Sequence, residues 1–125
     1  WIWIAGNHDP DPPSMLGGET ADTLTLGPLT FRHQAVPDRP APGELSGHFH
    51  PKATVATRGR RITARCFVTD GRRAILPSFG AYTGGLDVLD PAIAGLFRRA
   101  FTVHMLGRER IHAVERRKLL PWGRG

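Results

Sequence analysis

The chain has 125 residues, of which 40% are hydrophobic and 22% are charged, and this composition excludes a wholly disordered protein. Its length fits one domain with a modest core, and no apolar run approaches the roughly 18 residues that a membrane span requires. A single cysteine, Cys66, excludes an internal disulfide framework and is typical of a reducing compartment. We therefore expect a cytoplasmic location and no membrane partner.

The formal net charge of +6 is unevenly distributed along the chain. Residues 1–62 contain six basic and six acidic residues, whereas residues 63–125 contain the other 11 basic and 5 acidic residues. This asymmetry indicates an anionic partner, with nucleic acid as the first candidate, although an ordinary solvated basic surface is the alternative. The candidate phosphate contacts are Arg98, Arg99, Arg116, Arg117 and Lys118.

The first half of the chain predicts short strands separated by loops. Residues 1–5 are bulky and apolar and predict a buried strand, which ends at Gly6-Asn7-His8-Asp9-Pro10. The prolines that follow exclude regular hydrogen-bonded structure, so a loop leaves the strand end at this point. Further strands are expected at 23–26, 29–33 and 44–47.

The second half predicts two hairpins and one helix. Asp90-Pro91 is typical of a helix start, and the apolar spacing that follows predicts a helix continuing to Ala100. Three glycines within residues 79–86 predict an irregular segment, and the end from Glu115 is expected to be frayed. The predicted strands are 53–58, 61–69, 73–76, 101–106 and 110–114. The expected fold class is therefore strand-rich α/β (α+β).

Two histidines follow the strand predicted at 44–47. On a regular strand the side chains of His48 and His50 would face the same way, so both imidazoles could reach one metal ion. A His-x-His pair alone is a weak signal. His104 and His112 fall inside predicted strands, where packing or solvent exposure is the more usual role of a histidine.

The segment Asn7-His8-Asp9 offers a second kind of chemistry. The amide oxygen of Asn7 is a neutral metal ligand, and a histidine next to a carboxylate can be kept protonated and act as a general acid. The alternative is an ordinary turn, in which Asn and Asp are favoured. Two such loops at strand ends, with His33 as a third, indicate a functional site.

These segments carry a family resemblance. Gly6-Asn7-His8-Asp9 and Gly47-His48-Phe49-His50 resemble the Gly-Asn-His-Asp/Glu and Gly-His-x-His motifs of calcineurin-like metallophosphoesterases, and His33 lies between them. Together with Leu76-Pro-Ser-Phe-Gly-Ala-Tyr-Thr-Gly-Gly-Leu86, they resemble the branch of ligase-associated DNA-damage-response endonucleases. The similarity covers residues 1–115, as the C-terminal part of such a domain, and leaves 116–125 as a basic tail.

The resemblance implies a metallo-dependent phosphatase-like four-layer sandwich and a two-metal phosphodiesterase. Asn7, His33 and His48 would bind one ion, His50 would reach the other, and His8, oriented by Asp9, would stabilise the transition state or protonate the leaving oxygen. Manganese is the first candidate metal, with iron or zinc as alternatives. The implied substrate is a phosphodiester, with DNA as a candidate, and the implied setting is DNA repair with a functional link to DNA ligase and helicase.

The sequence also departs from the family pattern. It contains neither the Asp-x-His nor the Gly-Asp-x-x-Asp motif that would supply the remaining ligands and the bridging carboxylate, and only six residues precede Asn7. We therefore expect an N-terminally truncated, strand-rich half of the fold that is inactive or nearly so by itself. Two other hypotheses are a non-enzymatic basic nucleic-acid-binding module and a structural metal site built from His33, His48 and His50.

Overall fold

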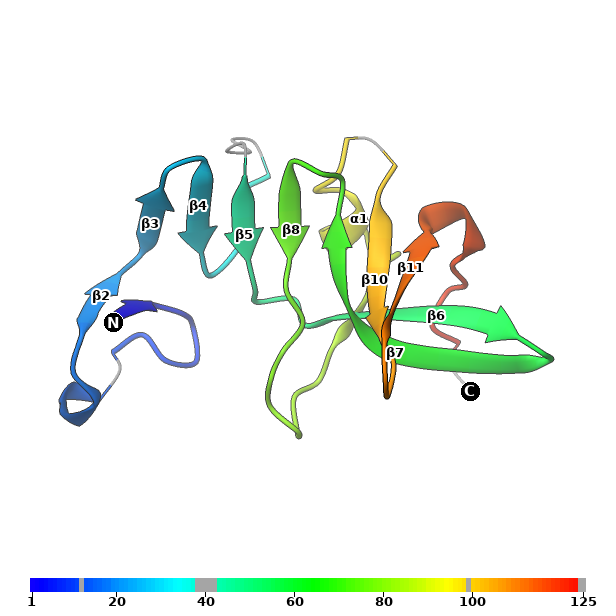
Figure 1. Ribbon diagram of the computed structural model, residues 1–125, viewed down its shortest axis with the longest axis horizontal. Helices are drawn as coiled ribbons and strands as arrows, with labels where there is room; N and C mark the ends of the chain where they lie inside the picture. The colour runs from blue at the N-terminus through cyan, green and yellow to red at the C-terminus, as the bar shows by residue number, and fades with distance from the viewer. Residues whose placement is uncertain (12, 38–42, 99, 124–125) are drawn as a thin grey trace.

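A computed structural model describes residues 1–11, 13–37, 43–98 and 100–123 (Figure 1). Within these ranges the chain forms eleven strands, one α-helix and two 3-10 turns. The elements are β1 (Ile2–Ile4), η1 (Ser14–Leu16), β2 (Glu19–Ala21), β3 (Thr23–Leu26), β4 (Leu29–Arg32), β5 (Glu44–Ser46), β6 (Pro51–Thr57), β7 (Arg60–Thr69), β8 (Arg73–Ile75), β9 (Leu86–Asp87), α1 (Pro91–Ala94), β10 (Thr102–Leu106), β11 (Ile111–Glu115) and η2 (Arg116–Lys118).

Most of the strands belong to one mixed sheet, in the order β11–β10–β7–β8–β5–β4–β3. The long strand β7 also pairs with β6, which in turn pairs with β9. The pairs β4–β5 and β5–β8 are parallel, whereas the two hairpins β6–β7 and β10–β11 are antiparallel. A separate parallel pair, β1–β2, lies at the N-terminal end. The expected strand-rich α/β fold is confirmed.

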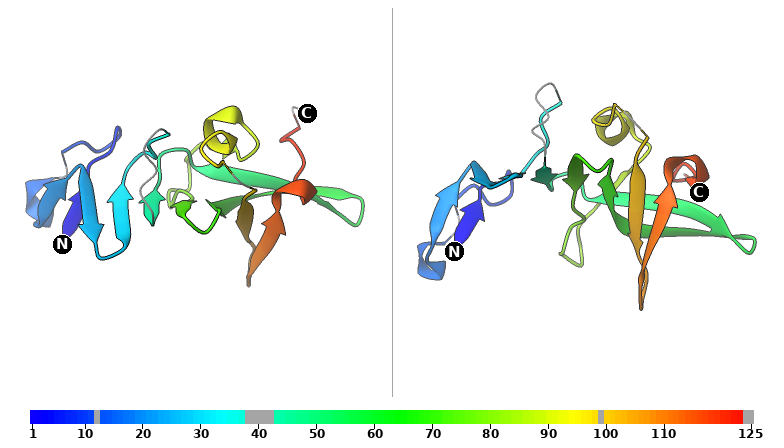
Figure 2. Two further views of the ribbon diagram at one scale, coloured as in Figure 1. Left: turned by 90° about the horizontal axis from the view of Figure 1, so that it is seen from above. Right: turned by 45° about the horizontal axis from the view of Figure 1, so that its top comes forward.

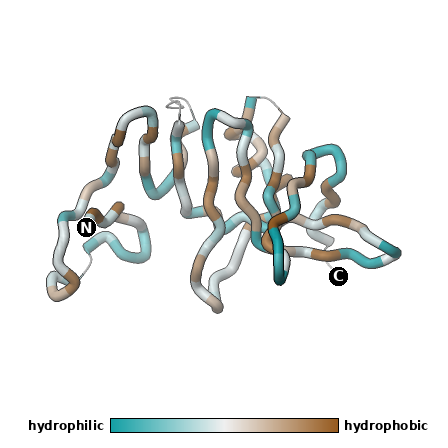
Figure 3. The backbone as a smooth tube through the Cα atoms, in the orientation of Figure 1, coloured by the Kyte–Doolittle hydropathy of each residue, from teal (hydrophilic) through white to brown (hydrophobic). Residues whose placement is uncertain are grey.

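The hydrophobic core lies where β7, β8 and β10 meet the segment around α1, which covers one face of the sheet (Figure 2). Alternate residues of β7, such as Cys66 and Val68, are fully buried and pack with Ile75, Val103 and Ile93. This matches the period-2 pattern of a strand with one face inward. Hydrophobic residues accordingly gather on these strands in Figure 3, while the tips of the hairpins are hydrophilic.

The helix is shorter than its apolar spacing predicts. It begins as expected, because the Asp90 side chain accepts a hydrogen bond from the Ala92 backbone N–H at 2.9 Å and Pro91 occupies the first helical position. It ends at Ala94, however, and the predicted continuation to Ala100 is wrong. Leu96 and Phe97 are buried in the core outside the helix, so packing overrides the local helical pattern. None of the helices in the described ranges has the length and apolar character required to cross a bilayer.

The two ends of the chain also differ from expectation. Strand β1 forms, but Trp1 is 83% exposed and Ile2 45% exposed, so the prediction of a buried strand is wrong. The prediction of a frayed C-terminal end is wrong as well. Leu119 is buried, and the Leu120 backbone N–H donates to the carbonyl of Thr54 at 2.9 Å. Pairing of Leu120 with the distant Thr54, which the local pattern does not encode, decides the outcome at the C-terminal end.

Candidate functional site

Three of the predicted site residues come together in space. The Nε2 atom of His33 lies 2.6 Å from Oδ1 of Asn7 and 3.1 Å from Nδ1 of His48. The rings of His33 and His48 meet edge to face, with their centroids 5.1 Å apart. Asn7 and His33 are 26 residues apart in the sequence and His33 and His48 are 15 apart, so the fold assembles this cluster.

Strand pairing explains how His33 and His48 meet. Because β4 and β5 are parallel neighbours with Arg32 opposite Ser46, the loops that leave their carboxyl ends begin side by side (Figure 1). The Gly47 backbone N–H donates to the carbonyl of His33 at 2.9 Å and ties the two loops together. Loops at the carboxyl ends of parallel strands are a usual place for a binding site in α/β folds.

Asn7 reaches the cluster through the loop that follows β1. A Cβ on the preceding residue, Gly6, would lie only 2.7 Å from Nδ1 of His33 and 2.9 Å from its Cε1. Only a glycine fits between this loop and the imidazole ring. The glycine of the Gly-Asn-His-Asp motif therefore allows the close approach that brings the Asn7 amide to His33.

His50 is near the cluster, but the expectation that His48 and His50 face the same way on a regular strand is wrong. Strand β5 ends at Ser46, and both His48 and His50 have a left-handed backbone, with φ of 68° and 50°. The two imidazoles therefore do not share a face as residues i and i+2 of a strand. Such positive φ values are uncommon for residues other than glycine and often occur at functional sites.

The imidazoles influence one another electrostatically. Burial, followed by the charges of His48, His8 and His50, lowers the pKa of His33. Burial, followed by His8, His48, Arg65 and Lys52, lowers the pKa of His50. Each partner is a group that carries positive charge when protonated, so these neighbours favour neutral imidazoles. The neutral imidazole is therefore the favoured form of His33 and His50, and it is the form that binds metal ions.

His8 and Asp9, the predicted catalytic pair, are both exposed in the same loop. The charge of His8 acts on both His33 and His50, which places it beside the cluster. Among the described residues, no hydrogen bond joins the Asp9 carboxylate to His8; the carbonyl of Asp9 instead accepts from the Gly6 backbone N–H at 3.3 Å. The structure thus brings His8 to the site without showing Asp9 orienting it.

A buried ionic network, which the sequence gives no motif to reveal, fixes the segment that carries His33. Glu44 is fully buried and lies 3.3 Å from Nε of Arg32 and 3.0 Å from a terminal nitrogen of Arg73. The same carboxylate accepts from the Val36 backbone N–H at 3.5 Å, and Arg73 donates to the carbonyl of Val36 at 2.8 Å. Contacts of Glu44 and Arg73 therefore fix the chain on both sides of His33, at residues 32 and 36.

A second feature missed from the sequence is the role of Arg65, which holds the glycine-rich loop next to His50. Its guanidinium donates to the carbonyls of Ser78, Gly80 and Ala81 at 3.3, 2.6 and 3.4 Å. A Cβ on Gly85 would lie 2.7 Å from the His50 carbonyl oxygen, so this loop packs directly on the His-bearing segment. The aromatic residues of the loop, Phe79 and Tyr82, are fully exposed.

The donor set suits one transition-metal ion, the one assigned to Asn7, His33 and His48, and does not provide a complete second site. The 3.1 Å between His33 Nε2 and His48 Nδ1 resembles the spacing of neighbouring ligands of an ion bound at about 2.0–2.2 Å. The 2.6 Å between His33 Nε2 and Asn7 Oδ1 is a hydrogen-bond distance, so Asn7 would have to move slightly away from His33 to bind the same ion. The described ranges contain no group of three or more His, Cys, Asp or Glu side chains placed to hold a metal ion. Asn7 is thus the third donor here, and no carboxylate joins it.

Comparisons with known proteins give one solved structure and no sequence match. No protein-family model matches the chain, and no curated protein matches it either. The crystal structure of Pseudomonas putida nuclease MPE resembles it with a TM-score of 0.66 and 31% sequence identity, over 90% of this chain and 53% of that one. The chain therefore spans about half the length of the nuclease structure to which it is similar.

Proposed function

We propose that this chain carries part of the metal site of a phosphodiesterase that cleaves nucleic acid. The observation that carries the proposal is the meeting of Asn7, His33 and His48 from three separate loops. The likeness to a nuclease structure supports a nucleic-acid substrate, and DNA is the candidate. The resemblance to ligase-associated endonucleases supports a role in DNA repair alongside a ligase and a helicase.

Asn7, His33 and His48 would hold one divalent ion, with Mn²⁺ the first candidate, and His50 would reach a second. Such ions lower the pKa of bound water and stabilise charge that develops on a phosphate. The protein groups around the site keep their imidazoles neutral for binding and supply positive charge from Lys52 and Arg65. An anionic diester would therefore be attracted to this edge of the sheet.

His8 is proposed as the group that donates a proton to the leaving oxygen. It is exposed, next to Asn7 in sequence, and close enough to influence two other histidines. A positioned imidazolium contributes about 10² to 10⁴ in rate in reactions of this type. Asp9 is proposed to orient His8, with which it shares the loop after β1.

Metal binding tests the proposal directly. We expect the chain to bind Mn²⁺, and the variants Asn7→Ala and His33→Ala to weaken that binding by at least about tenfold. His112→Ala is the matched control, because His112 is exposed in β11. Isothermal titration calorimetry measures the affinity, and circular dichroism checks folding. Absence of Mn²⁺ binding, or equal binding by the three variants, would contradict the site.

Activity is expected to be low in this chain alone. Without the Asp-x-His and Gly-Asp-x-x-Asp motifs, three neutral ligands hold one ion and the bridging carboxylate is missing. Hydrolysis of bis(p-nitrophenyl) phosphate with added Mn²⁺ should therefore be far slower than that by a full-length relative that carries both motifs. Comparable turnover by the two proteins would overturn this part of the proposal.

A structural metal site has less support. It would need His50 as a ligand with His33 and His48, whereas the side chains in hydrogen-bond contact with His33 in the described ranges are those of Asn7 and His48. Cys66, the thiol that a structural zinc site would favour, is fully buried in β7. The arrangement favours an open, substrate-accessible site instead.

A further inference from the structure

The two antiparallel hairpins, β6–β7 and β10–β11, project beyond the core and carry arginines at their tips. Arg58, Arg60 and Arg61 surround the first turn, and Arg108 and Arg110 the second. All five residues are exposed. Glu109 is the one acidic residue within the two turns, so these segments hold four of the six net positive charges of the chain.

Both turns hold their arginines on a defined backbone. Arg58 and the next residue have φ of 49° and 75°, which matches the two-residue turn that the right-handed twist of a hairpin favours. Thr57 pairs with Arg60 immediately behind it. In the second hairpin, the Gly107 backbone N–H donates to the carbonyl of Arg110 at 3.0 Å. The charges are therefore displayed by ordered strands.

The tip arginines are free of acidic partners among the described residues. The ion pairs in those ranges join Glu44 to Arg32 and Arg73, and Glu115 to Arg117. Arg61 donates to the carbonyl of Pro121, which leaves its charge unneutralised. Unpaired guanidinium groups bind phosphate oxygens well, because their planar donors can engage two oxygens at once.

Two of the other basic residues singled out from the sequence are less available. Arg116 stacks over the ring of Phe101 at 5.1 Å, and Arg117 is paired with Glu115. Arg98 and Lys118 are exposed, while Arg99 lies outside the described residues. The largest group of unpaired positive charge in the described ranges is therefore on the hairpins.

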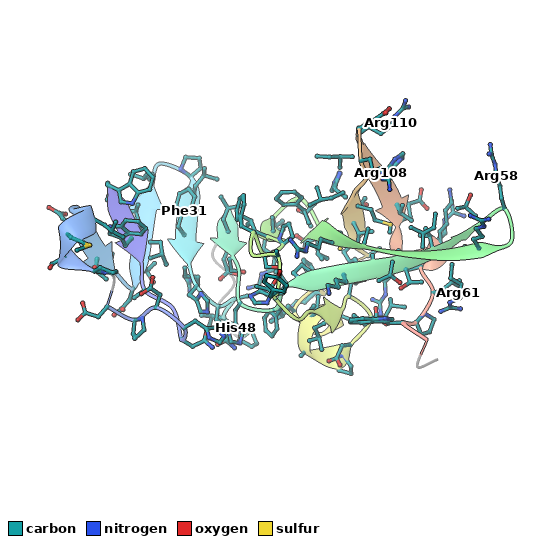
Figure 4. All side chains as sticks on the ribbon, turned by 90° about the horizontal axis from the view of Figure 1, so that it is seen from below. Phe31, His48, Arg58, Arg61, Arg108 and Arg110 are labelled. Atoms are coloured by element: carbon teal, nitrogen blue, oxygen red, sulfur yellow. The ribbon has the colours of Figure 1, made fainter. Side chains whose placement is uncertain are left out.

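Three of the five tip arginines extend in a common direction. Figure 4 shows Arg58, Arg108 and Arg110 extending to the same side of the β6–β7 ribbon, while Arg61 and His48 lie on the other side. A polyanion contacted by the first three would therefore lie on a different face from the histidine cluster.

We propose that the β6–β7 and β10–β11 tips together bind the phosphate backbone of a nucleic acid, as a surface distinct from the Asn7–His33–His48 cluster. The choice of nucleic acid among polyanions rests on the proposed function. Backbone contacts of this kind position a nucleic acid without reading its sequence. The surface would therefore add affinity for a long substrate and leave a small diester unaffected.

The test measures binding of a fluorescein-labelled DNA oligonucleotide of about 20 nucleotides by fluorescence anisotropy, across a range of salt concentrations in EDTA. We expect the combined variant Arg58→Ala, Arg60→Ala, Arg108→Ala and Arg110→Ala to bind at least about tenfold more weakly at low salt. The magnitude of the slope of log K against log salt should fall by about 3, because each of the four lost phosphate contacts removes about 0.7–0.9. The four corresponding Arg→Lys changes should keep most of the slope.

The matched control is the double variant Arg72→Ala and Arg98→Ala, which removes exposed arginines elsewhere. Equal weakening by the control, or an unchanged slope in the tip variant, would overturn the inference. Exposed Ile62 and Ile111 lie close to the tips, so the same protein is tested for co-sedimentation with vesicles of anionic phospholipid. Tip-dependent vesicle binding that DNA fails to displace would also overturn it.

The DNA-binding test of the hairpin tips can fail independently of the Mn²⁺-binding test of the proposed metal site. Mn²⁺ binding by the tip variant should equal that of the unaltered chain, since the tips lie apart from the cluster. If Mn²⁺ binds and DNA affinity does not depend on the tips, this inference alone fails. If DNA affinity depends on the tips and no Mn²⁺ binds, the proposed metal site alone fails.

Discussion

The imidazole of His33 lies directly against the backbone of Gly6, where an added methyl group would be 2.7 Å from Nδ1. The variant Gly6→Ala should therefore push His33 or the Asn7 loop out of place. We expect Mn²⁺ affinity to fall by at least about tenfold, as when the supports of a metal ligand are lost, with a destabilisation of about 1–3 kcal/mol from overpacking. Calorimetric titration and urea unfolding measure the two effects.

Gly84→Ala is the control for this prediction, because a Cβ at Gly84 would meet no atom within 4 Å. It should leave both Mn²⁺ affinity and stability nearly unchanged. Wild-type affinity in Gly6→Ala would show that the close contact with His33 has no part in metal binding.

The carboxylate of Glu44 should be essential to stability. It is fully buried between Arg32 and the 3%-exposed Arg73. In Glu44→Gln, the guanidinium groups lose their counter-charge, and breaking a buried pair costs about 3–5 kcal/mol. Urea denaturation should show a loss of that size. Glu115→Gln, which breaks the exposed pair with Arg117, should leave the free energy of unfolding unchanged within error.

The glycine-rich loop should depend on Arg65 for its rigidity. Arg65→Met removes hydrogen bonds to three carbonyls, those of Ser78, Gly80 and Ala81. Because Phe79 and Tyr82 are fully exposed, we expect chymotrypsin to cut this loop about tenfold faster in the variant. Mass spectrometry identifies the cut, and Arg60→Met, on the exposed part of the same strand, is the control. Equal cleavage rates in the two variants would contradict a holding role for Arg65.

Cys66 should be unreactive in the folded protein. Burial, with a smaller contribution from the charge of Asp87, raises the pKa of its thiol to about 12. Since the thiolate is the reactive form, a raised pKa means that almost none is present at pH 8. Ellman's reagent should therefore label the folded chain very slowly and label one thiol rapidly in guanidinium chloride. Rapid labelling before unfolding would show that the β7 face around Cys66 is open.

Local patterns in the sequence predicted the strands and turns well because their signals are short-range. The alternation in β7, the turn before Arg60 and the Asp90 cap each depend on neighbouring residues. The helix end could not be predicted in the same way, since Leu96 and Phe97 have helical spacing but are drawn into the core. Strand β2 was not predicted because it forms by pairing with β1, 17 residues away in the sequence.

The sequence predicted that Asn7, His33 and His48 belong together, and it did not predict the geometry by which they meet. Motif resemblance identified Asn7, His33 and His48, whose contacts the structure contains. The parallel pairing of β4 with β5 and the clamp by Glu44 are tertiary features, and no local pattern encodes them. The arginine-bearing tips were not predicted. Counting the charge separately in the two halves of the chain assigns Arg58 and Arg108 to different halves, whereas the fold places them on neighbouring hairpins.

The contacts of His33 join loops that are far apart in the sequence, so an ion at the proposed site would couple its binding to folding. An unfolded chain would have to bring Asn7, His33 and His48 together at an entropic cost before it could bind an ion well. A divalent ion should therefore bind the native state in preference and raise the melting temperature as its concentration rises. The unfolding transition would in this way report on occupancy of the proposed site without any measurement of catalysis.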